Sequence, residues 1–266
     1  MYICNKYNST NLEGTHMVNI VIDRLKSSKG KIGFYYKNLV TNEEISFNEN
    51  ETFFAASVIK LPILAAVFSE VSKGNASLSE LIKVKNNDKV PGCGALYSFT
   101  DEPAADLQTL CNLMITISDN TATNVLIKHF TIEKLSEKFM KMGLKNTKLK
   151  RLLFDRDAKQ RGMENLFTPK EIGMLLEQIY NRTFVNAKVS EEIEKILLEQ
   201  QINHKIPSRL PNIRIAHKTG EDDGITHDVG VVYADEPFII VFASNETDVH
   251  EFEKVIRDIS YELAVR

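Results

Sequence analysis

Residues 53–71, FFAASVIKLPILAAVFSEV, are an apolar stretch that carries two polar residues, Ser57 and Lys60, near its start. The Leu, Ile, Ala and Val content of residues 57–71 predicts a buried helix. Pro62 falls near the first turn of that helix, where a missing backbone N–H costs least. Because positions i and i+3 share one face of a helix, the Ser57 and Lys60 side chains are expected to point the same way.

Strands are predicted on both sides of this helix, near the two ends of the chain. Before it, residues 31–40 and 43–48 form a predicted hairpin with its turn at Thr41–Asn42. After Pro211, three further strands are predicted at residues 213–218, 227–234 and 238–244. Helices are predicted at residues 15–27 and 248–264, so each end of the chain also contributes one helix.

The middle of the chain is predicted to be helical, with apolar periodicity at residues 107–117, 121–130, 170–180 and 191–201. The economical architecture is an α+β fold. It has one antiparallel sheet of about five strands, built from both chain ends and flanked by the terminal helices, with an inserted all-helical domain. We expect residues 1–60 and 205–266 to form the sheet part and residues 61–204 the helical part of one compact unit, with the active site in the cleft between them.

Composition narrows the range of partners. The 266 residues are 43% hydrophobic and 26% charged, with a formal net charge of −3, so no concentrated basic face for nucleic acid is expected. No segment approaches the roughly 18 continuous apolar residues of a membrane helix. The polar segment Met1–Asn11 lacks the pattern of a signal peptide, so we expect a soluble chain, cytoplasmic as given or exported if a signal lies outside it. We also expect a monomer. The three cysteines, Cys4, Cys93 and Cys111, match no zinc or redox spacing.

Three short motifs carry the chemistry, and the first is Ser57-Val58-Ile59-Lys60. A hydroxyl is a poor nucleophile until a neighbouring base takes its proton, and a buried lysine near another cation loses its own proton more easily than a free one. Lys60 could therefore activate Ser57. Taken alone, the pattern is weak, because Ser28 and Lys31 repeat it in a polar turn.

The second motif, Ser118-Asp119-Asn120, follows the first by 61 positions, and the third, Lys218-Thr219-Gly220, follows the second by 100. Ser118 could relay a proton to a leaving nitrogen and Asn120 could bind a substrate amide, although all three residue types of the second motif also cap helices. Lys218 and Thr219 offer a cation and a hydroxyl to a substrate carboxylate. Gly220 would allow close approach of a substrate to the backbone.

With these motifs in order, the chain resembles the class A β-lactamases, within the superfamily of serine β-lactamases and penicillin-binding proteins. The resemblance runs from about residue 31 to the C-terminus and includes residues 118–124 (SDNTATN), 168–169 (TP), 217–220 (HKTG) and 228–233 (DVGVVY). It implies an acyl-enzyme on Ser57, an oxyanion hole made of the Ser57 and Glu221 backbone N–H groups, and protonation of the leaving nitrogen by Lys218 and Ser118. It implies no metal and no organic cofactor.

Two departures from the family pattern bear on mechanism. The position of the Ω-loop Glu that activates the deacylating water falls on or near Leu153, which cannot do acid–base work. Asp155, Asp157 and Glu164 are possible substitutes.

The second departure is an acidic trio, Glu221, Asp222 and Asp223, which follows the third motif and would oppose a substrate carboxylate unless its side chains point to water. His227 could supply a compensating donor or could be a solvated strand residue.

Several functions remain open on the sequence. The leading one is β-lactam hydrolysis, with acylation intact and deacylation slow or dependent on another base. Alternatives are a D,D-peptidase or esterase on the same scaffold, a penicillin-binding sensor that is acylated without turnover, and a glutaminase-type amidase. The expected partner is a small β-lactam or a D-Ala-D-Ala-like peptide.

Overall fold

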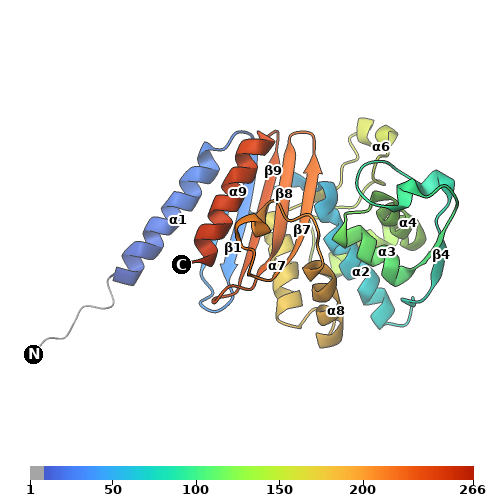
Figure 1. Ribbon diagram of the computed structural model, residues 1–266, viewed down its shortest axis with the longest axis horizontal. Coiled ribbons are helices and arrows are strands. Elements are labelled where there is room, and N and C mark those ends of the chain that lie inside the picture. The colour runs from blue at the N-terminus through green and yellow to red at the C-terminus, as the bar shows by residue number, and fades with distance from the viewer. Residues whose placement is uncertain (1–8) are drawn as a thin grey trace, which may run out of the picture.

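A five-stranded antiparallel sheet forms the centre of one half of the molecule (Figure 1). The computed structural model describes residues 9–266, with side chains described from His16 onward, so Met1–Asn8 lie outside the described residues. The sheet order is β2-β1-β9-β8-β7, which brings the first and last strands of the chain side by side. The strands are β1 (Lys31–Asn38), β2 (Glu44–Phe47), β7 (Ile215–Asp222), β8 (Ile225–Val232) and β9 (Phe238–Asn245). The expected sheet from both chain ends is confirmed.

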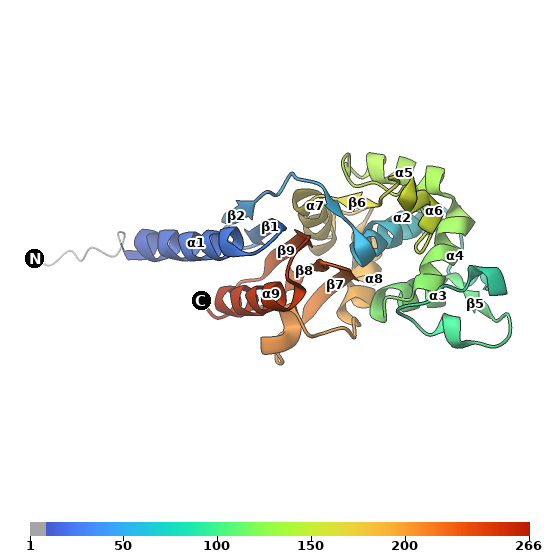
Figure 2. The same ribbon diagram turned by 90° about the horizontal axis from the view of Figure 1, so that it is seen from above.

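Helices cover both faces of this sheet (Figure 2). The helices α1 (Ser9–Ser27) and α9 (Val249–Ala264) lie on one face, and α7 (Pro169–Tyr180) packs on the other. Strand β9 shows why the sheet is two-sided. Phe238, Ile240 and Phe242 belong to the core beneath α1 and α9, while Ile239 and Val241 belong to the core on the opposite face. Successive side chains of a strand alternate between faces, so a continuous apolar run fits a strand covered on both sides.

The helical part lies beside the sheet and is built around α2 (Lys60–Ser72), whose residues 60–69 are all buried. A helix that is apolar on every side must be surrounded by protein. The other helices are α3 (Leu107–Thr116), α4 (Asn120–Phe130), α5 (Ile132–Lys141), α6 (Arg156–Gln160) and α8 (Ala187–Leu198). Short strands also occur here, namely β4 (Leu81–Lys83) with β5 (Ala104–Asp106), and β6 (Leu166–Phe167) with β3 (Phe53–Phe54).

Local details differ from the sequence prediction for identifiable reasons. The predicted two-residue turn at Thr41–Asn42 is a longer loop, because the Asn38 side chain accepts hydrogen bonds from the backbone N–H groups of Val40 and Thr41 and ends β1 early. The predicted helix at residue 57 begins as a 3₁₀ turn, η1 (Ala56–Ile59), before α2.

Strand β7 extends to Asp222, four residues beyond its predicted end, since Gly220 and Asp222 still pair with β8. The chain then turns at Asp223–Gly224, where Gly224 has φ +64°. Asp-Gly is the residue pair that tight hairpin turns favour.

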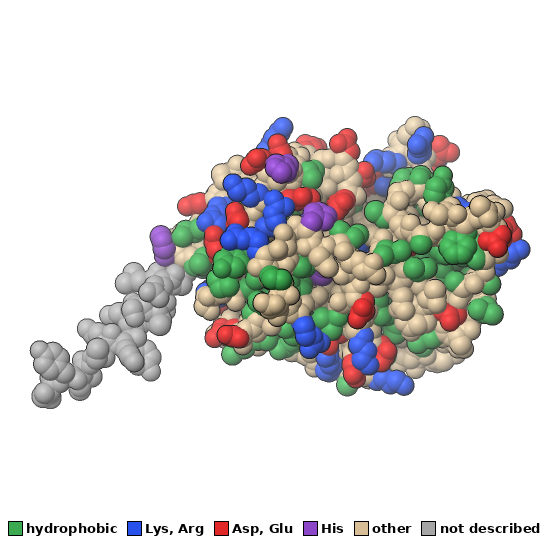
Figure 3. Space-filling model, viewed as in Figure 1, with side chains coloured by type: hydrophobic (Ala, Val, Ile, Leu, Met, Phe, Trp, Pro, Cys, Tyr) green, Lys and Arg blue, Asp and Glu red, His purple; other side chains and the backbone are tan. Residues whose placement is uncertain are grey.

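Charged side chains of both signs are interspersed on the face seen in Figure 3. No helix among residues 9–266 combines the length and the apolar character needed to cross a membrane.

Candidate active site

Ser57 lies in η1, at the edge of a cleft of about 460 Å³ between the sheet and the helical part. The residue before it, Ala56, has φ +42°, and Ser118 across the cleft has φ +55°. Left-handed backbone is costly for residues other than glycine and tends to persist only where the surrounding structure enforces it. Both strained positions therefore mark the place where the first two motifs meet.

Lys60 is fully buried and its amine joins the first two motifs. The Lys60 Nζ lies 2.9 Å from Ser57 Oγ, 2.9 Å from Ser118 Oγ, 2.8 Å from the Ser118 carbonyl oxygen and 2.8 Å from Asn120 Oδ1. Burial and, after it, the nearby charge of Lys218 hold the pKa of Lys60 well below its ordinary value. The amine is thus biased toward its neutral, basic form.

The hydrogen-bonding partners of the Lys60 amine determine how its neutral form would be oriented. A neutral amine has two hydrogens and one lone pair, and two of its four neighbours, the Ser118 carbonyl and Asn120 Oδ1, can only accept. If the hydrogens go to these oxygens, the lone pair is left for the two hydroxyls, Ser57 Oγ and Ser118 Oγ. Such an arrangement would suit a base that removes a proton from Ser57 Oγ.

In the second motif, Asp119 holds neighbouring backbone groups and Asn120 lines the cleft. Asp119 caps α4 by accepting from Ala122 N at 2.8 Å, and its other oxygen accepts from Ala95 N and Leu96 N at 2.7 and 2.9 Å. Asp119 therefore fixes the loop at Ala95 and Leu96, a role for which the motif alone gives no signal. The Asn120 amide is held by Lys60 and by the Pro91 carbonyl, and it lines the cleft.

The third motif lies on β7 beside the first two. Lys218 is fully buried and its Nζ donates to Ser118 Oγ at 3.1 Å and to the Thr219 carbonyl at 2.8 Å. Burial is the main cause that lowers the pKa of Lys218 to about 7. The polar atoms thus run without a break from Ser57 Oγ through Lys60 Nζ and Ser118 Oγ to Lys218 Nζ.

Gly220 allows a close contact within the protein, where the sequence analysis expected room for a substrate. A Cβ atom at this position would lie 2.9 Å from the His227 ring, 3.1 Å from Val58 Cγ2 and 3.3 Å from Val58 N. The absence of a side chain lets β7 pack closely against η1 at Val58.

Two of the three acidic residues after the motif, Glu221 and Asp222, lie beside cations. Glu221 forms an ion pair with Lys205 at 2.8 Å, and Asp222 lies 3.6 Å from Lys159. Burial would raise the pKa of the Glu221 carboxyl, but the charge and hydrogen bond of Lys205 outweigh it and hold that pKa below its ordinary value. Lys205 is fully buried and also donates to the His227 carbonyl at 3.1 Å. Lys205 belongs to no motif, so the sequence gives no signal that it pairs with Glu221.

His227 is neither a substrate donor nor a solvated residue. Its ring is fully buried, with Nε2 bonded to the Phe54 carbonyl at 2.9 Å and Nδ1 accepting from Ser244 N at 3.1 Å. Burial lowers the pKa of His227 to about 3, so the ring is neutral and fastens β8 to β3 and β9.

The loop that faces Ser57 from the helical part presents Leu153 to the cleft. The Asn124 side chain holds this residue by both backbone groups, accepting from Leu153 N at 2.8 Å and donating to Leu153 O at 2.9 Å. Asn165 fixes the other end of the loop through Lys150 N and the Arg151 backbone. The loop is therefore ordered around an apolar side chain.

The acidic residues of the same loop are engaged elsewhere. Glu164 lines the cleft, but its Oε2 accepts two hydrogen bonds from Arg151, at 2.7 and 3.1 Å. Asp155 also lines the cleft and caps α6 through Ala158 N. Asp157 lies exposed in the first turn of α6. Cys93 is exposed at the cleft, whereas Cys111 is buried and burial raises the pKa of its thiol.

This chain is similar in sequence and in structure to several β-lactamases. VEB-1, a β-lactamase of Pseudomonas aeruginosa, is 28% identical over 255 residues, covering 89% of this chain and 85% of the relative. The crystal structure of a β-lactamase from Sphaerobacter thermophilus matches with a TM-score of 0.86 and 27% identity, over 93% of this chain and 95% of the other.

A structure of PBP-A matches with a TM-score of 0.86 and 25% identity, over 94% of this chain and 95% of the other, as does a mutant of PBP-A in an acyl-enzyme complex with penicillin G. The model of the "Beta-lactamase enzyme family" matches residues 17–265. The chain therefore belongs to the β-lactamase enzyme family.

Proposed function

We propose that this protein is a serine β-lactam hydrolase in which Ser57 is the nucleophile and Lys60 its base. The observation that carries the proposal is the Lys60 amine, which is buried, has a lowered pKa and lies 2.9 Å from Ser57 Oγ. General-base catalysis needs a group within hydrogen-bond reach of the proton it removes, with a pKa near the working pH. We expect the protein to act as a monomer on a small β-lactam or on a D-Ala-D-Ala-like peptide.

Acylation follows from the contacts around Ser57. Lys60 takes the Ser57 proton as Oγ attacks the carbonyl carbon, and the backbone N–H groups of Ser57 and Glu221 stabilise the oxyanion. The C–N bond then breaks, and the leaving nitrogen takes a proton from the Ser118 hydroxyl, which is resupplied by Lys60 or Lys218. Lys218, Thr219 and Asn120 bind the carboxylate and amide of the substrate.

Deacylation is the slow step in this proposal. A water molecule that attacks the acyl-enzyme needs a base, and the loop opposite Ser57 offers the side chain of Leu153. Of the neighbouring acids, Glu164 is paired with Arg151 and Asp155 caps a helix. These contacts compete with any role of the two carboxylates as the base.

The same observation favours a second candidate function, a penicillin-binding protein with D,D-peptidase or sensor activity. An acyl-enzyme without a base for its water would be long-lived. The similarity of this chain to PBP-A is equally compatible with a penicillin-binding protein and with a lactamase.

Intact-mass spectrometry over time with penicillin separates these functions. We expect rapid formation of a mass adduct, its absence in Ser57→Ala, and its decay over minutes or longer. An adduct that never decays would favour the penicillin-binding function. Rapid steady-state turnover without a burst would contradict slow deacylation, and no adduct would point to a different acyl substrate.

A further inference from the structure

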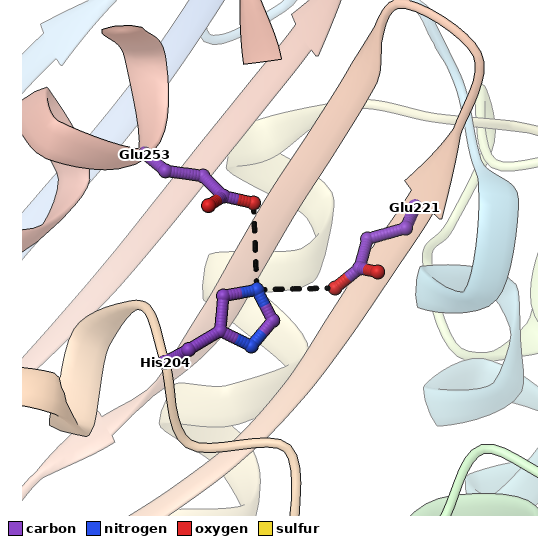
Figure 4. A group of neighbouring side chains, drawn as sticks. All are labelled: His204, Glu221 and Glu253. Atoms are coloured by element: carbon purple, nitrogen blue, oxygen red, sulfur yellow. Dashed lines mark ion pairs between the residues drawn. The ribbon is translucent and has the colours of Figure 1, made fainter. Parts of the chain in front are cut away.

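Three side chains of types that bind metal ions converge beside β7, in the sheet part of the molecule (Figure 4). His204 precedes the 3₁₀ turn η4 (Ile206–Arg209), Glu221 lies on β7, and Glu253 lies on α9. Figure 4 shows the two carboxylates directed at one atom, His204 Nε2, with Glu253 above it and Glu221 to its right. The three residues are far apart in the sequence, and only the folded sheet brings them together.

The spacing of their ligand atoms suits a shared metal ion better than hydrogen bonds. The His204 Nε2 lies 3.5 Å from Glu221 Oε1 and 3.4 Å from Glu253 Oε1. These separations are long for N–H···O hydrogen bonds, which centre near 2.9 Å. Two ligands of a tetrahedral Zn²⁺ at about 2.0–2.2 Å lie about 3.3–3.6 Å apart. All three ligand atoms lie within 4.8 Å of one another.

Neighbouring groups orient the two carboxylates. Glu253 Oε1 accepts from Thr226 Oγ1 at 3.2 Å, and Glu221 Oε1 is paired with the buried Lys205 at 2.8 Å. Partners of this kind hold ligating carboxylates in position. Lys205, together with Arg257 at 3.7 Å from Glu253, also opposes a cation, which limits the affinity of the site.

We propose that His204, Glu221 and Glu253 bind one divalent transition-metal ion, with Zn²⁺ as the preferred ion. One imidazole and two carboxylates are ligands that zinc accepts, with water completing the coordination. The site is separate from the Ser57 chemistry, to which it is joined only through Glu221.

Isothermal titration calorimetry of the chelator-treated full chain with zinc chloride tests the site. We expect one zinc ion per chain, and affinity weakened at least about tenfold in His204→Ala and in Glu253→Gln, as for other losses from a metal site. His250→Ala is the matched control, because it removes an exposed histidine from the same helix as Glu253, and it should bind as wild type does.

Thermal unfolding gives a second readout that needs no catalytic activity. Zinc should raise the Tm of the wild type and of His250→Ala, but not that of His204→Ala, because a ligand that binds only the native state stabilises it. Equal zinc affinity in wild type and His204→Ala, or no heat of binding at millimolar zinc, would overturn the proposal. Neither result would depend on whether Ser57 is acylated.

Discussion

The rate of Ser57 acylation should follow the ionisation of Lys60 across a range of pH where ordinary lysines do not titrate. A lysine with the usual pKa of about 10.4 is neutral in only about one molecule in 2,500 at pH 7, and each unit by which the pKa falls raises that fraction about tenfold. Burial and the charge of Lys218 lower the pKa of Lys60. The first-order rate of acylation at saturating penicillin should therefore rise with pH and level off well below pH 10.

The magnitude can be tested by removing the base. Lys60→Met keeps the length of the side chain in the core but provides no proton acceptor. Loss of a general base costs about 10²- to 10⁴-fold in rate, or about 3–5 kcal/mol of transition-state stabilisation. The adduct on Ser57 would be measured by rapid quench and intact-mass spectrometry from pH 5 to 10, with far-UV circular dichroism as a check on folding.

Two results would refute this reasoning. One is a wild-type profile that still rises about tenfold per pH unit up to pH 10, because it would mean that burial does not lower the pKa of Lys60. The other is a folded Lys60→Met protein that acylates within about threefold of wild type. The base would then be another group, with Lys60 positioning Ser57 and Ser118 only.

Four further predictions concern the cleft and its supports. Leu153→Glu should speed deacylation at least about tenfold by giving the water a base, measured as decay of the penicillin adduct; an unchanged adduct lifetime would exclude Leu153 as the deficient position. Asn124→Ala should lower the free energy of unfolding by about 2–4 kcal/mol, because it leaves both backbone groups of Leu153 unpaired; urea unfolding measures this, and an unshifted midpoint would count against it. Lys218 is a cation below its pKa of about 7 and loses its charge as the pH rises, so affinity for penicillin should fall above pH 7 while that for its methyl ester should not; parallel profiles in binding assays would remove Lys218 as the carboxylate partner. Gly220→Ala should slow acylation while the chain still folds, since the new Cβ would press on Val58 and displace Ser57; wild-type acylation would show that η1 can give way.

The sequence predicted the parts of the site that lie close together along the chain or carry a known motif. Ser57 and Lys60 are three residues apart on one turn, so their contact follows from local geometry. The strands were also predictable, because β9 has a long apolar run and strand-like patterns lie near both ends of the chain. The helix α8 was predicted four residues late, since its start is set by Asn186, which caps Val189 N, and not by apolar periodicity.

The remaining features depend on tertiary packing. Lys205 and His227 look like ordinary surface residues in the sequence, but both are fully buried, Lys205 against the His227 carbonyl and His227 against Phe54 and Ser244. The same holds for His204, which meets Glu221 and Glu253 from separate elements. A single sequence gives no signal for such contacts, since they join isolated polar residues that follow no periodic pattern.

The pairing of β1 with β9 has a consequence for how the protein is made. Lys31 pairs with Asn245, so the first strand of the sheet must wait for the last one to be synthesised. At about 5–20 residues per second, that wait is about 10–40 s on the ribosome. During this time α2 and its neighbours can already be packed, whereas β1 has an open edge and Lys218 has not yet been translated. The sheet beside the cleft can therefore be completed only after β9 has emerged, and until then chaperones would protect the open edge of β1 from aggregation.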